Sequence, residues 1–339
     1  MRLVAPLLLM AAACAVATGA LAAGSYRFTA LAPITGASQS FGVALNDLGV
    51  AAGTSDSGEG GGPNGATVWL RGVPTALLSL GGPGAYSSAQ GINNLGQVVG
   101  DSTTTEGPGH ATRWTGGTPV DLGTLGGGHY SIALAINHRG QVVGYSDVLV
   151  GGLSTTHAAL WQGTTVTDLG TLGGSYSSAR SINRWGQVVG SSTGPGNASV
   201  RAVLWQAGSL TDLGSGYALC INDAGQVVGT DGQVATLWSD GVQTSLGTLG
   251  GSLSSAAGIN NAGLIVGNSL LAGDVTGHAA MWQGGVAVDL NTLLDDATRA
   301  AGWVLLDANG VNERGAIIGT AYNSVTGEQR GYVLRPLGN

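Results

Sequence analysis

The apolar positions of the chain fall in short runs that alternate with polar or small residues and are separated by glycine-rich turns. The segment from Asp168 to Gly190, which reads DLGTLGGSYSSARSINRWGQVVG, shows the pattern, and variants of it recur until the C-terminus. Period-two runs bounded by Gly, Asn and Ser are typical of β-strands joined by tight turns. The pattern therefore predicts many short strands arranged in a repeated unit.

An asparagine that follows Leu, Ile or Val and lies three positions before a glycine gives the clearest measure of the repeat. Asn starts a turn by hydrogen-bonding its own backbone, and Gly accepts the positive φ that other residues resist, so each Asn-x-x-Gly predicts a hairpin turn. The spacing runs from 38 residues, between Asn222 and Asn260, to 52 residues, between Asn260 and Asn312. Such a period is typical of repeat architectures, including the propeller blade. The seven asparagines are Asn46, Asn93, Asn137, Asn183, Asn222, Asn260 and Asn312.

Each module is predicted to contain four strands. Strand one reads Ala-x-x-Ile-Asn, as in Ala179 to Asn183, and strand two reads Gln-Val-Val-Gly, as in Gln187 to Gly190. Strand four, for example Val166 to Leu169, leads through Gly-Thr-Leu-Gly-Gly into the next module. We expect the tryptophans that end strand three to pack between sheets, each burying about 200 Å², and Trp185, in a strand one to strand two turn, to be exposed. The strand-three tryptophans are Trp69, Trp114, Trp161, Trp205, Trp238 and Trp282.

The two ends of the chain predict how the modules are arranged. The last module has three strands, Ala308 to Val311, Ala316 to Thr320 and Gly331 to Arg335, while Tyr26 to Leu31 precedes the first module as strand four precedes the others. If this N-terminal strand completes the last module, the ring closes and no sheet edge of a terminal module is exposed. The chain is therefore predicted to be an all-β, seven-bladed β-propeller of four-stranded blades closed by its N-terminal strand. The alternative is a β-solenoid, which would need polar caps at both ends.

Residues 1–22 are predicted to form a secretory signal peptide, and residues 23–339 a single repeat domain. Met1 and Arg2 provide a short positive region, Leu3 to Ala17 an uncharged apolar run, and Ala20-Leu21-Ala22 a small-x-small cleavage site. The first six modules are expected near residues 42–82, 89–127, 133–174, 179–216, 218–251 and 256–294, and the last over residues 308–335, completed by residues 26–31.

The signal predicts export to the periplasm, the cell surface or the medium. The apolar run falls short of the roughly 18 to 20 residues that a membrane span needs, so we expect no span in the mature chain. An uncleaved anchor and lipidation of Cys14 are the alternatives. The mature chain keeps one cysteine, Cys220, which lies in the apolar run Ala218 to Ile221 and is expected to be a buried small side chain.

Composition supports an all-β chain and limits its partners. The chain has 62 Gly, 9% charged residues and no Lys, and a sequence rich in Gly, Thr, Val and Ser suits short strands better than helices. Its formal charge is −7, and its Arg residues are scattered singly along the sequence. Because the sequence shows no basic stripe, we expect no nucleic-acid partner. We expect a monomer whose partner is a protein, a glycan or a small ligand.

Three motifs that recur in a fixed order resemble a known family. Ala-x-x-Ile-Asn-x-x-Gly-Gln-Val-Val-Gly is followed by His-Ala-x-x-Trp and then by Asp-Leu-Gly-Thr-Leu-Gly-Gly. Over nearly the whole mature chain this order is similar to the HAF-type extracellular repeat of bacterial secreted proteins. The resemblance implies a secreted or surface location and a repeat β fold, and it implies no activity. The chain departs from the pattern where Arg201 and Arg330 replace the His and where Ser79 and Ser245 replace the Asp.

The recurrent His and Asp residues are the first candidates for chemistry. Ligands of one zinc ion lie about 2.0 to 2.1 Å from it, whereas packed sheets are about 10 Å apart, so the repeated histidines cannot share a metal. The repeated Asp is expected to accept N–H bonds from the turn that follows it. We therefore assign no catalytic, cofactor-binding or metal site and expect no cofactor. The residues concerned are His110, His157, His278, Asp121, Asp168, Asp212 and Asp289.

One polar insertion interrupts the repeat before the last module. It contains Asp295, Asp296 and Arg299, with Trp303 close behind. The alternating Asp and Asn spacing of a calcium loop is not found there. The insertion is expected to form a short helical turn that covers the closing blade.

Function is expected on the loops between strands two and three, because these vary in length while the other connections are short. Asp101 to Gly109 and Asp231 to Gln233 show the range. In an antiparallel blade these loops share one face with the Gly-Thr-Leu-Gly-Gly links, and binding sites concentrate on loops held by a rigid scaffold. We predict a secreted, non-catalytic binding or interaction scaffold with its site on that face, near the central opening. The alternatives are a structural cell-surface element and a carbohydrate-active or other hydrolase or lyase that uses carboxylates or His129, His138 and Asp307.

Overall fold

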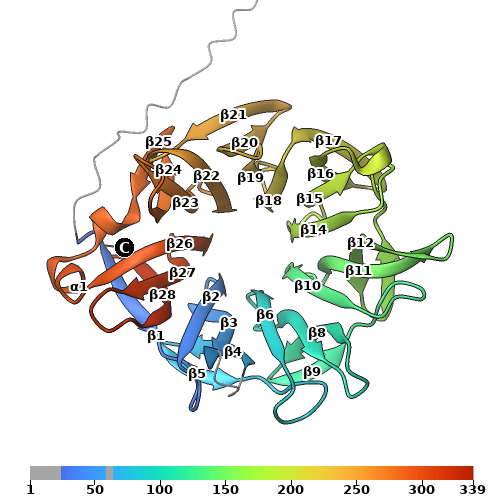
Figure 1. Cartoon of the computed structure of the whole chain (residues 1–339), viewed down its shortest axis with the longest axis horizontal. Coiled ribbons are helices and arrows are strands. Elements are labelled where there is room, and N and C mark those ends of the chain that lie inside the picture. Colours follow the sequence, from blue (N-terminus) through green and yellow to red (C-terminus); the bar gives the residue numbers. More distant parts are fainter. Residues whose placement is uncertain (1–23, 59–63, 339) are drawn as a thin grey trace, which may run out of the picture.

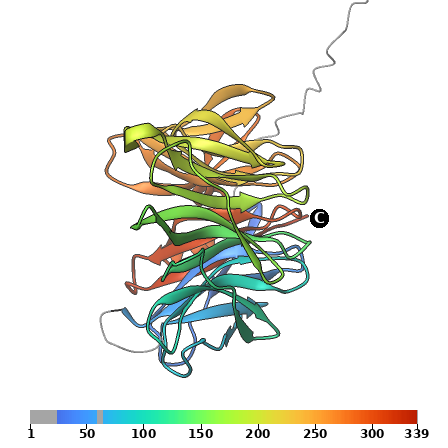
Figure 2. The same cartoon turned by 90° about the vertical axis from the view of Figure 1, so that its right-hand side faces the viewer.

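The chain forms a ring of seven four-stranded antiparallel sheets. The computed structural model describes residues 24–58 and 64–338. Figure 1 shows the sheets as blades around a central axis, and Figure 2 shows neighbouring blades packed face to face. The architecture is a seven-bladed β-propeller, which confirms the predicted fold. The alternative β-solenoid is wrong, because the sheets close into a ring.

Blades one to six follow the order of the chain. Within each of these blades the first strand is nearest the axis and the fourth is outermost (Figure 1). Blade one consists of β2 (Gln39–Leu45), β3 (Val50–Asp56), β4 (Gly65–Leu70) and β5 (Val73–Ala76). Blade two consists of β6 (Ser87–Ile92), β7 (Val98–Thr103), β8 (Gly109–Thr115) and β9 (Thr118–Asp121). Blade three consists of β10 (Ser131–Ile136), β11 (Val142–Val150), β12 (Leu153–Gln162) and β13 (Thr165–Asp168).

The second half of the ring repeats this arrangement. Blade four consists of β14 (Ser177–Ile182), β15 (Val188–Thr193), β16 (Val200–Gln206) and β17 (Ser209–Ser215), with the 3₁₀ turn η2 (Pro195–Asn197) between β15 and β16. Blade five consists of β18 (Tyr217–Ile221), β19 (Val227–Thr230), β20 (Ala235–Ser239) and β21 (Val242–Gly247). Blade six consists of β22 (Gly250–Ile259), β23 (Ile265–Leu271), β24 (Gly277–Gln283) and β25 (Val286–Asp289).

Blade seven joins the two ends of the chain. Its inner strands are β26 (Trp303–Val311), β27 (Ile317–Asn323) and β28 (Gln329–Pro336), and its outer strand is β1 (Tyr26–Leu31). Strand β1 pairs antiparallel with β28, so that Tyr26 lies opposite Pro336 and Leu31 opposite Gly331. The N-terminal strand therefore closes the ring in the way that the sequence predicts.

The first two strands of each blade are joined by the Asn-x-x-Gly turn. In blade one the side-chain Oδ1 of Asn46 accepts the backbone N–H groups of Leu48 at 3.1 Å and Val50 at 2.9 Å. Gly49 has φ +80°, which glycine adopts without steric cost. The asparagine thus replaces backbone partners within the turn, and the glycine permits the reversal of the chain.

The glycine of Gln-Val-Val-Gly is required by close packing inside the blade. The innermost strand of blade four has a register shift between Ala179 and Ser181, where it bulges toward the second strand. A Cβ atom at Gly190 would lie 1.9 Å from the carbonyl oxygen of Ser178. No side chain fits at that distance, so the glycine allows the backbones to approach.

The core lies between the blades and is centred on the tryptophans. The six that end the third strands are at most 5% exposed, which confirms their predicted place in the core. Trp114 packs with Ala66 and Ala89 and donates its Nε1–H to the carbonyl oxygen of Leu78 at 2.6 Å. In blade seven Leu334 takes the corresponding position, opposite Ile317. Each indole therefore packs one blade against the blade before it.

The insertion before blade seven covers that blade. The 3₁₀ turn η3 (Leu290–Leu293) leads to helix α1 (Asp296–Ala300), whose first turn is capped by Asp295 through the amide of Thr298 at 2.7 Å. Leu290 and Leu293 are buried in the core of the closing blade. The predicted short helical turn is therefore observed.

The predictions of a signal peptide and of export rest on residues outside those that the structure describes. The signal peptide predicted for residues 1–22, including Cys14, lies outside the described residues. Within residues 24–58 and 64–338, no helix has the length and apolar character needed to cross a membrane.

Candidate axial site

The seven turn asparagines form a ring of hydrogen bonds around the axis. Each donates its side-chain Nδ2–H to the backbone carbonyl of the next asparagine, as Asn183 does to Asn222 at 3.1 Å. The last step, from Asn312 to Asn46, closes the ring at 3.0 Å. All seven are buried. The ring comprises Asn46, Asn93, Asn137, Asn183, Asn222, Asn260 and Asn312. It fixes the position of the residue that follows each asparagine.

That following residue lies at the axis and differs from blade to blade. In five blades its backbone N–H donates to the side chain of the next such residue, as Glu313 does to Asp47 Oδ1 at 2.9 Å and Asp47 does to Asn94 Oδ1 at 2.8 Å. These bonds orient polar side chains around one opening. We call the seven the rim residues: Asp47, Asn94, His138, Arg184, Asp223, Asn261 and Glu313.

The rim residues surround an axial pocket of about 280 Å³. Its floor consists of the aliphatic residue that precedes each ring asparagine, for example Ile136, Ile182 and Ile221, which are less than 10% exposed. The polar rim and the apolar floor give the pocket two different surfaces. A molecule of small size can hydrogen-bond at the mouth and place an apolar part on the floor.

Carboxylates determine the charge of the rim. Asp47, Asp223 and Glu313 carry three negative charges against the single guanidinium of Arg184. Partial desolvation of Glu313 raises the pKa of its carboxyl; the Asn261 N–H opposes that rise, and the charges of Asp47 and Asp223 add to it. The axial pocket therefore has an excess of negative charge, and a cation in it would relieve the repulsion among the carboxylates.

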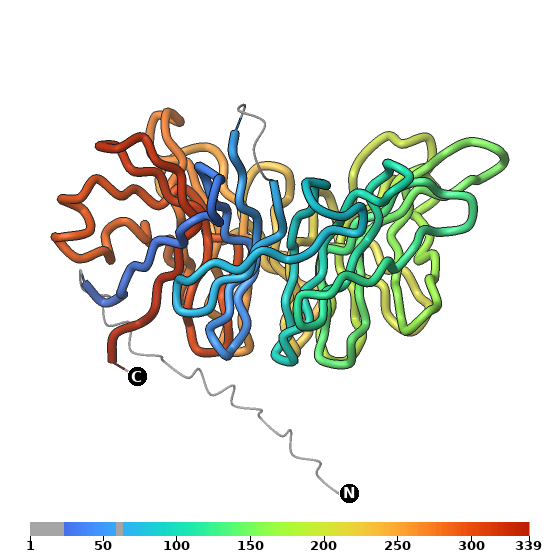
Figure 3. Tube along the Cα trace, turned by 90° about the horizontal axis from the view of Figure 1, so that it is seen from below, coloured from blue at the N-terminus to red at the C-terminus, as the bar shows by residue number. Residues whose placement is uncertain are grey.

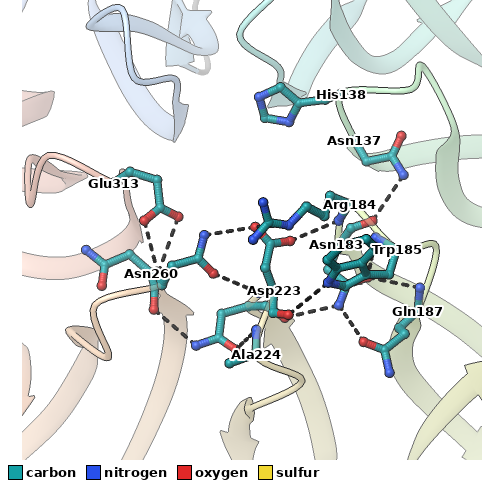
Figure 4. A network of polar contacts seen from close by, with 12 residues as sticks. Asn137, His138, Asn183, Arg184, Trp185, Gln187, Asp223, Ala224, Asn260 and Glu313 are labelled. Atoms are coloured by element: carbon teal, nitrogen blue, oxygen red, sulfur yellow. Dashed lines mark hydrogen bonds and ion pairs between the residues drawn. The ribbon is translucent and has the colours of Figure 1, made fainter.

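Arg184 is held over the pocket by two neighbours. Its Nε lies 3.2 Å from the carboxylate of Asp223, and its guanidinium lies 5.0 Å from the centre of the Trp185 ring. Trp185 in turn donates its Nε1–H to the Asp223 carbonyl at 3.0 Å and is 59% exposed, as predicted. Figure 4 shows Glu313 and Arg184 extending toward each other from opposite sides, with Asp223 between them.

The axial pocket lies at the end of the ring opposite to the variable loops. Its residues belong to the strand one to strand two turns. In Figure 3 the turns at the lower edge are nearly level, whereas the loops at the upper edge have uneven heights. The sequence pointed to the upper edge because length variation is visible in the sequence. The variation at the lower edge is in side-chain chemistry alone, at the two positions between the Asn and the Gly of each turn.

The residues named for a hydrolase do not come together. His138 is a rim residue, but neither His129 nor Asp307 lines the axial pocket. Asp307 lies on the innermost strand of blade seven, where it accepts the Thr320 N–H at 2.8 Å and where burial raises the pKa of its carboxyl. The structure therefore does not bring these three residues together in the axial pocket.

The repeated His and Asp residues form local pairs on the outer half of the blades. His157 Nδ1 lies 2.8 Å from Asp168 Oδ2, and the same distance is found in blades two and six. In blade four Arg201 replaces the histidine and pairs with Asp212. The second carboxylate oxygen accepts the N–H of the following turn, as Asp168 does from Gly170 at 2.7 Å, which confirms the predicted role of the Asp. The constant spacing of 11 residues between the partners is the sequence signal for this pairing.

Two further candidate sites can be judged from the structure. Among the described residues, no group of three or more His, Cys, Asp or Glu side chains is arranged to hold a metal ion. Cys220 lies on β18 in the inner part of blade five, with Ser181 and the Ile259 carbonyl as its neighbours. Burial raises the pKa of its thiol, which disfavours the reactive thiolate.

Comparisons with known proteins give similarity to solved structures alone. No protein-family model matches the chain, and no curated protein matches it. A solved structure of a gluconolactonase from Xanthomonas campestris is similar at 11% sequence identity and a TM-score of 0.45, covering 94% of this chain and 92% of that chain. No residue, substrate or activity is carried from that protein to this one.

The comparison contradicts the prediction of a non-catalytic binding scaffold. The finding is the name of that solved structure, a gluconolactonase, and at this degree of similarity it assigns no activity to the present chain. The prediction of a non-catalytic role rests on the variable loops and on the absence of a catalytic constellation from the sequence. In a ring of blades, however, a site is assembled from single residues of different modules, so the absence of a local motif does not argue against chemistry.

Proposed function

We propose that the axial pocket takes up a small molecule that carries an amino group. The observation behind this proposal is that seven turns of the same backbone geometry present seven polar side chains to one opening, and that three of these are carboxylates. Asp47 and Glu313 lie on adjacent blades and provide the most negative part of the rim. A protonated amine there would be attracted by both carboxylates, while its carbon atoms rest on the aliphatic floor.

The test uses small amines as probes and charge-neutral variants of the rim. Ethanolamine, an amino sugar and the corresponding neutral sugar are titrated into the full chain and followed by ligand-observed NMR. The amines should bind and the neutral sugar should bind more weakly. Glu313→Gln should weaken amine binding by about fivefold, which corresponds to loss of one partly exposed ion pair. Asp240→Asn removes an exposed carboxylate far from the axis and is the control. Equal binding of the amine and the neutral sugar, or equal loss in both variants, would contradict the proposal.

Acid–base chemistry in the same pocket is the second candidate function. It is favoured by Glu313, because desolvation raises the pKa of its carboxyl at the mouth of the axial pocket, and a raised pKa favours the protonated form that a general acid needs. The neighbouring carboxylates of Asp47 and Asp223 would stabilise developing positive charge. Hydrolysis of a panel of esters and glycosides tests this candidate. Activity that is lost in Glu313→Gln and retained in Asp240→Asn would establish it, and activity that both variants retain would place the chemistry elsewhere.

A further inference from the structure

The structure gathers four arginines in one pocket, although the Arg residues are dispersed in the sequence. Arg27, Arg71, Arg314 and Arg335 line a pocket of about 550 Å³ beside the closure of the ring. Arg27 and Arg335 lie on β1 and β28 of blade seven, Arg314 on the β26–β27 turn and Arg71 on the β4–β5 turn of blade one. We call it the seam pocket. The sequence shows no basic stripe, and this cluster arises because ring closure joins segments from both ends of the chain.

The four guanidinium groups are not neutralised by the protein. Among the described residues, none of the four takes part in an ion pair. The one carboxylate that lines the seam pocket, Asp47, already accepts the Glu313 N–H and the Asn94 side-chain N–H. The pocket thus contains four positive charges and one negative charge, in a chain whose formal charge is −7.

Two features of the pocket cost the folded protein free energy. Arg27 lies directly opposite Arg335 in the β1–β28 pair, and like charges at opposed positions of neighbouring strands are destabilising. Arg71 has φ +55° at a turn position that is Gly116 in blade two and Ala207 and Asp240, also with positive φ, in blades four and five, and a non-glycine residue is disfavoured in that conformation. An anion between the guanidinium groups would offset the repulsion between Arg27 and Arg335.

We propose that the seam pocket binds a tetrahedral oxyanion, a phosphate or sulfate group. Guanidinium groups form paired N–H···O bonds with such groups, and four of them suit a group with two negative charges and several acceptor oxygens. The bound anion would connect blade seven to blade one across the closing strand β1. It would therefore stabilise the ring as well as occupy the site. The seam pocket shares Asp47 and Asn312 with the axial pocket, but its four arginines do not line the axial pocket. The phosphate proposal therefore does not depend on amine binding.

The direct test is titration of inorganic phosphate into the full chain by calorimetry, at low ionic strength and against sodium chloride of the same ionic strength. We expect one saturable site whose affinity falls as salt is added. Arg71→Gln and Arg314→Gln should each weaken phosphate binding by about tenfold. The matched control is Arg139→Gln. Arg139 occupies in blade three the turn position that Arg314 occupies in blade seven, but it does not line the seam pocket, so its replacement should leave the affinity for phosphate unchanged. No saturable binding, or the same affinity in all three variants, would overturn the proposal.

Melting temperatures in chloride and in phosphate distinguish loss of phosphate binding from a general loss of stability in the variants. Arg27→Gln removes the charge that opposes Arg335, so it should raise the melting temperature in chloride buffer and reduce the further rise that phosphate causes. A lower melting temperature in chloride buffer together with an undiminished phosphate effect would contradict the proposal. Titration with sulfate and glycerol 3-phosphate then identifies the source of the group. If glycerol 3-phosphate binds with an affinity like that of phosphate, the site accepts an esterified phosphate group. If only inorganic phosphate and sulfate bind, the site accepts the free anions.

Discussion

Asn312 donates its side-chain amide to the backbone carbonyl of Asn46, 3.0 Å away in space and 266 residues earlier in the sequence. This hydrogen bond completes the ring of hydrogen bonds among the turn asparagines, which passes through every blade beside the axial pocket. The same residue type therefore closes the hairpin turn, joins neighbouring blades and places the rim residue that follows it.

The ring of hydrogen bonds predicts very different effects for two adjacent asparagines. Asn260 is 3% exposed, accepts the Leu264 N–H and donates to the Asn312 carbonyl, whereas Asn261 is an exposed rim residue. Asn260→Ala should lower the free energy of unfolding by about 2 to 4 kcal/mol, because it leaves buried backbone groups without partners. Asn261→Ala should change it by less than about 1 kcal/mol. Urea denaturation measures both, and equal effects would contradict the role of the ring of hydrogen bonds.

The close approach inside each blade predicts that its glycine cannot be replaced. A methyl group at Gly190 would overlap the carbonyl of Ser178, whereas nothing lies within 4 Å of the same position at Gly194. Gly190→Ala should cost more than about 4 kcal/mol of stability, and Gly194→Ala should have an effect of about 0.5 kcal/mol or less. Thermal unfolding of the two variants makes the comparison. A stable Gly190→Ala protein would show that the first strand can move away.

The paired His and Asp predict a tolerated exchange. Blade four already has Arg201 bound to Asp212 where blade three has His157 bound to Asp168. His157→Arg should therefore keep the pair and change the free energy of unfolding by less than about 1 kcal/mol. Asp168→Ala removes both the pair and the acceptor for the Gly170 amide, and it should cost about 1 to 2 kcal/mol. The reverse order of the two effects in urea denaturation would contradict this interpretation.

The buried carboxyl of Asp307 predicts a dependence of stability on pH. Burial raises its pKa in the folded state, so its contribution is most favourable below the unfolded pKa of about 3.9 and is lost as the pH rises through the folded pKa. Asp307→Asn keeps an oxygen acceptor for the Thr320 amide without the charge. Its stability relative to the wild-type protein should rise from about pH 4 toward neutral pH. Denaturation at several pH values tests this, with the exposed Asp240→Asn as control, and a difference that does not change with pH would contradict it.

The architecture could be predicted because its determinants are local and repeated. Asn-x-x-Gly and the tryptophan at the end of strand three occur in nearly every module, and Tyr26 to Leu31 has the pattern of the strand that the last module lacks. Each of these signals is visible within a few residues, and their recurrence gives the number of blades.

The candidate sites could not be predicted in this way, because ring closure creates them. The rim residues occupy one of the two variable positions in each turn, so no motif marks Glu313 or Arg184 as members of one site. Arg27 and Arg335 belong to opposite ends of the chain and meet only where β1 pairs with β28. The variable loops, which the sequence does display, lie at the other end of the ring from the axial pocket.

The position of the functional end of the ring is best tested by an amide NMR titration of the full chain with ethanolamine. The account predicts that the largest shift changes occur at the rim residues, above all at Asp47 and Glu313, with little change in the β11–β12 and β15–β16 loops. Shift changes that are concentrated in those loops, or that are spread evenly over the surface, would contradict the assignment of the axial pocket as the site.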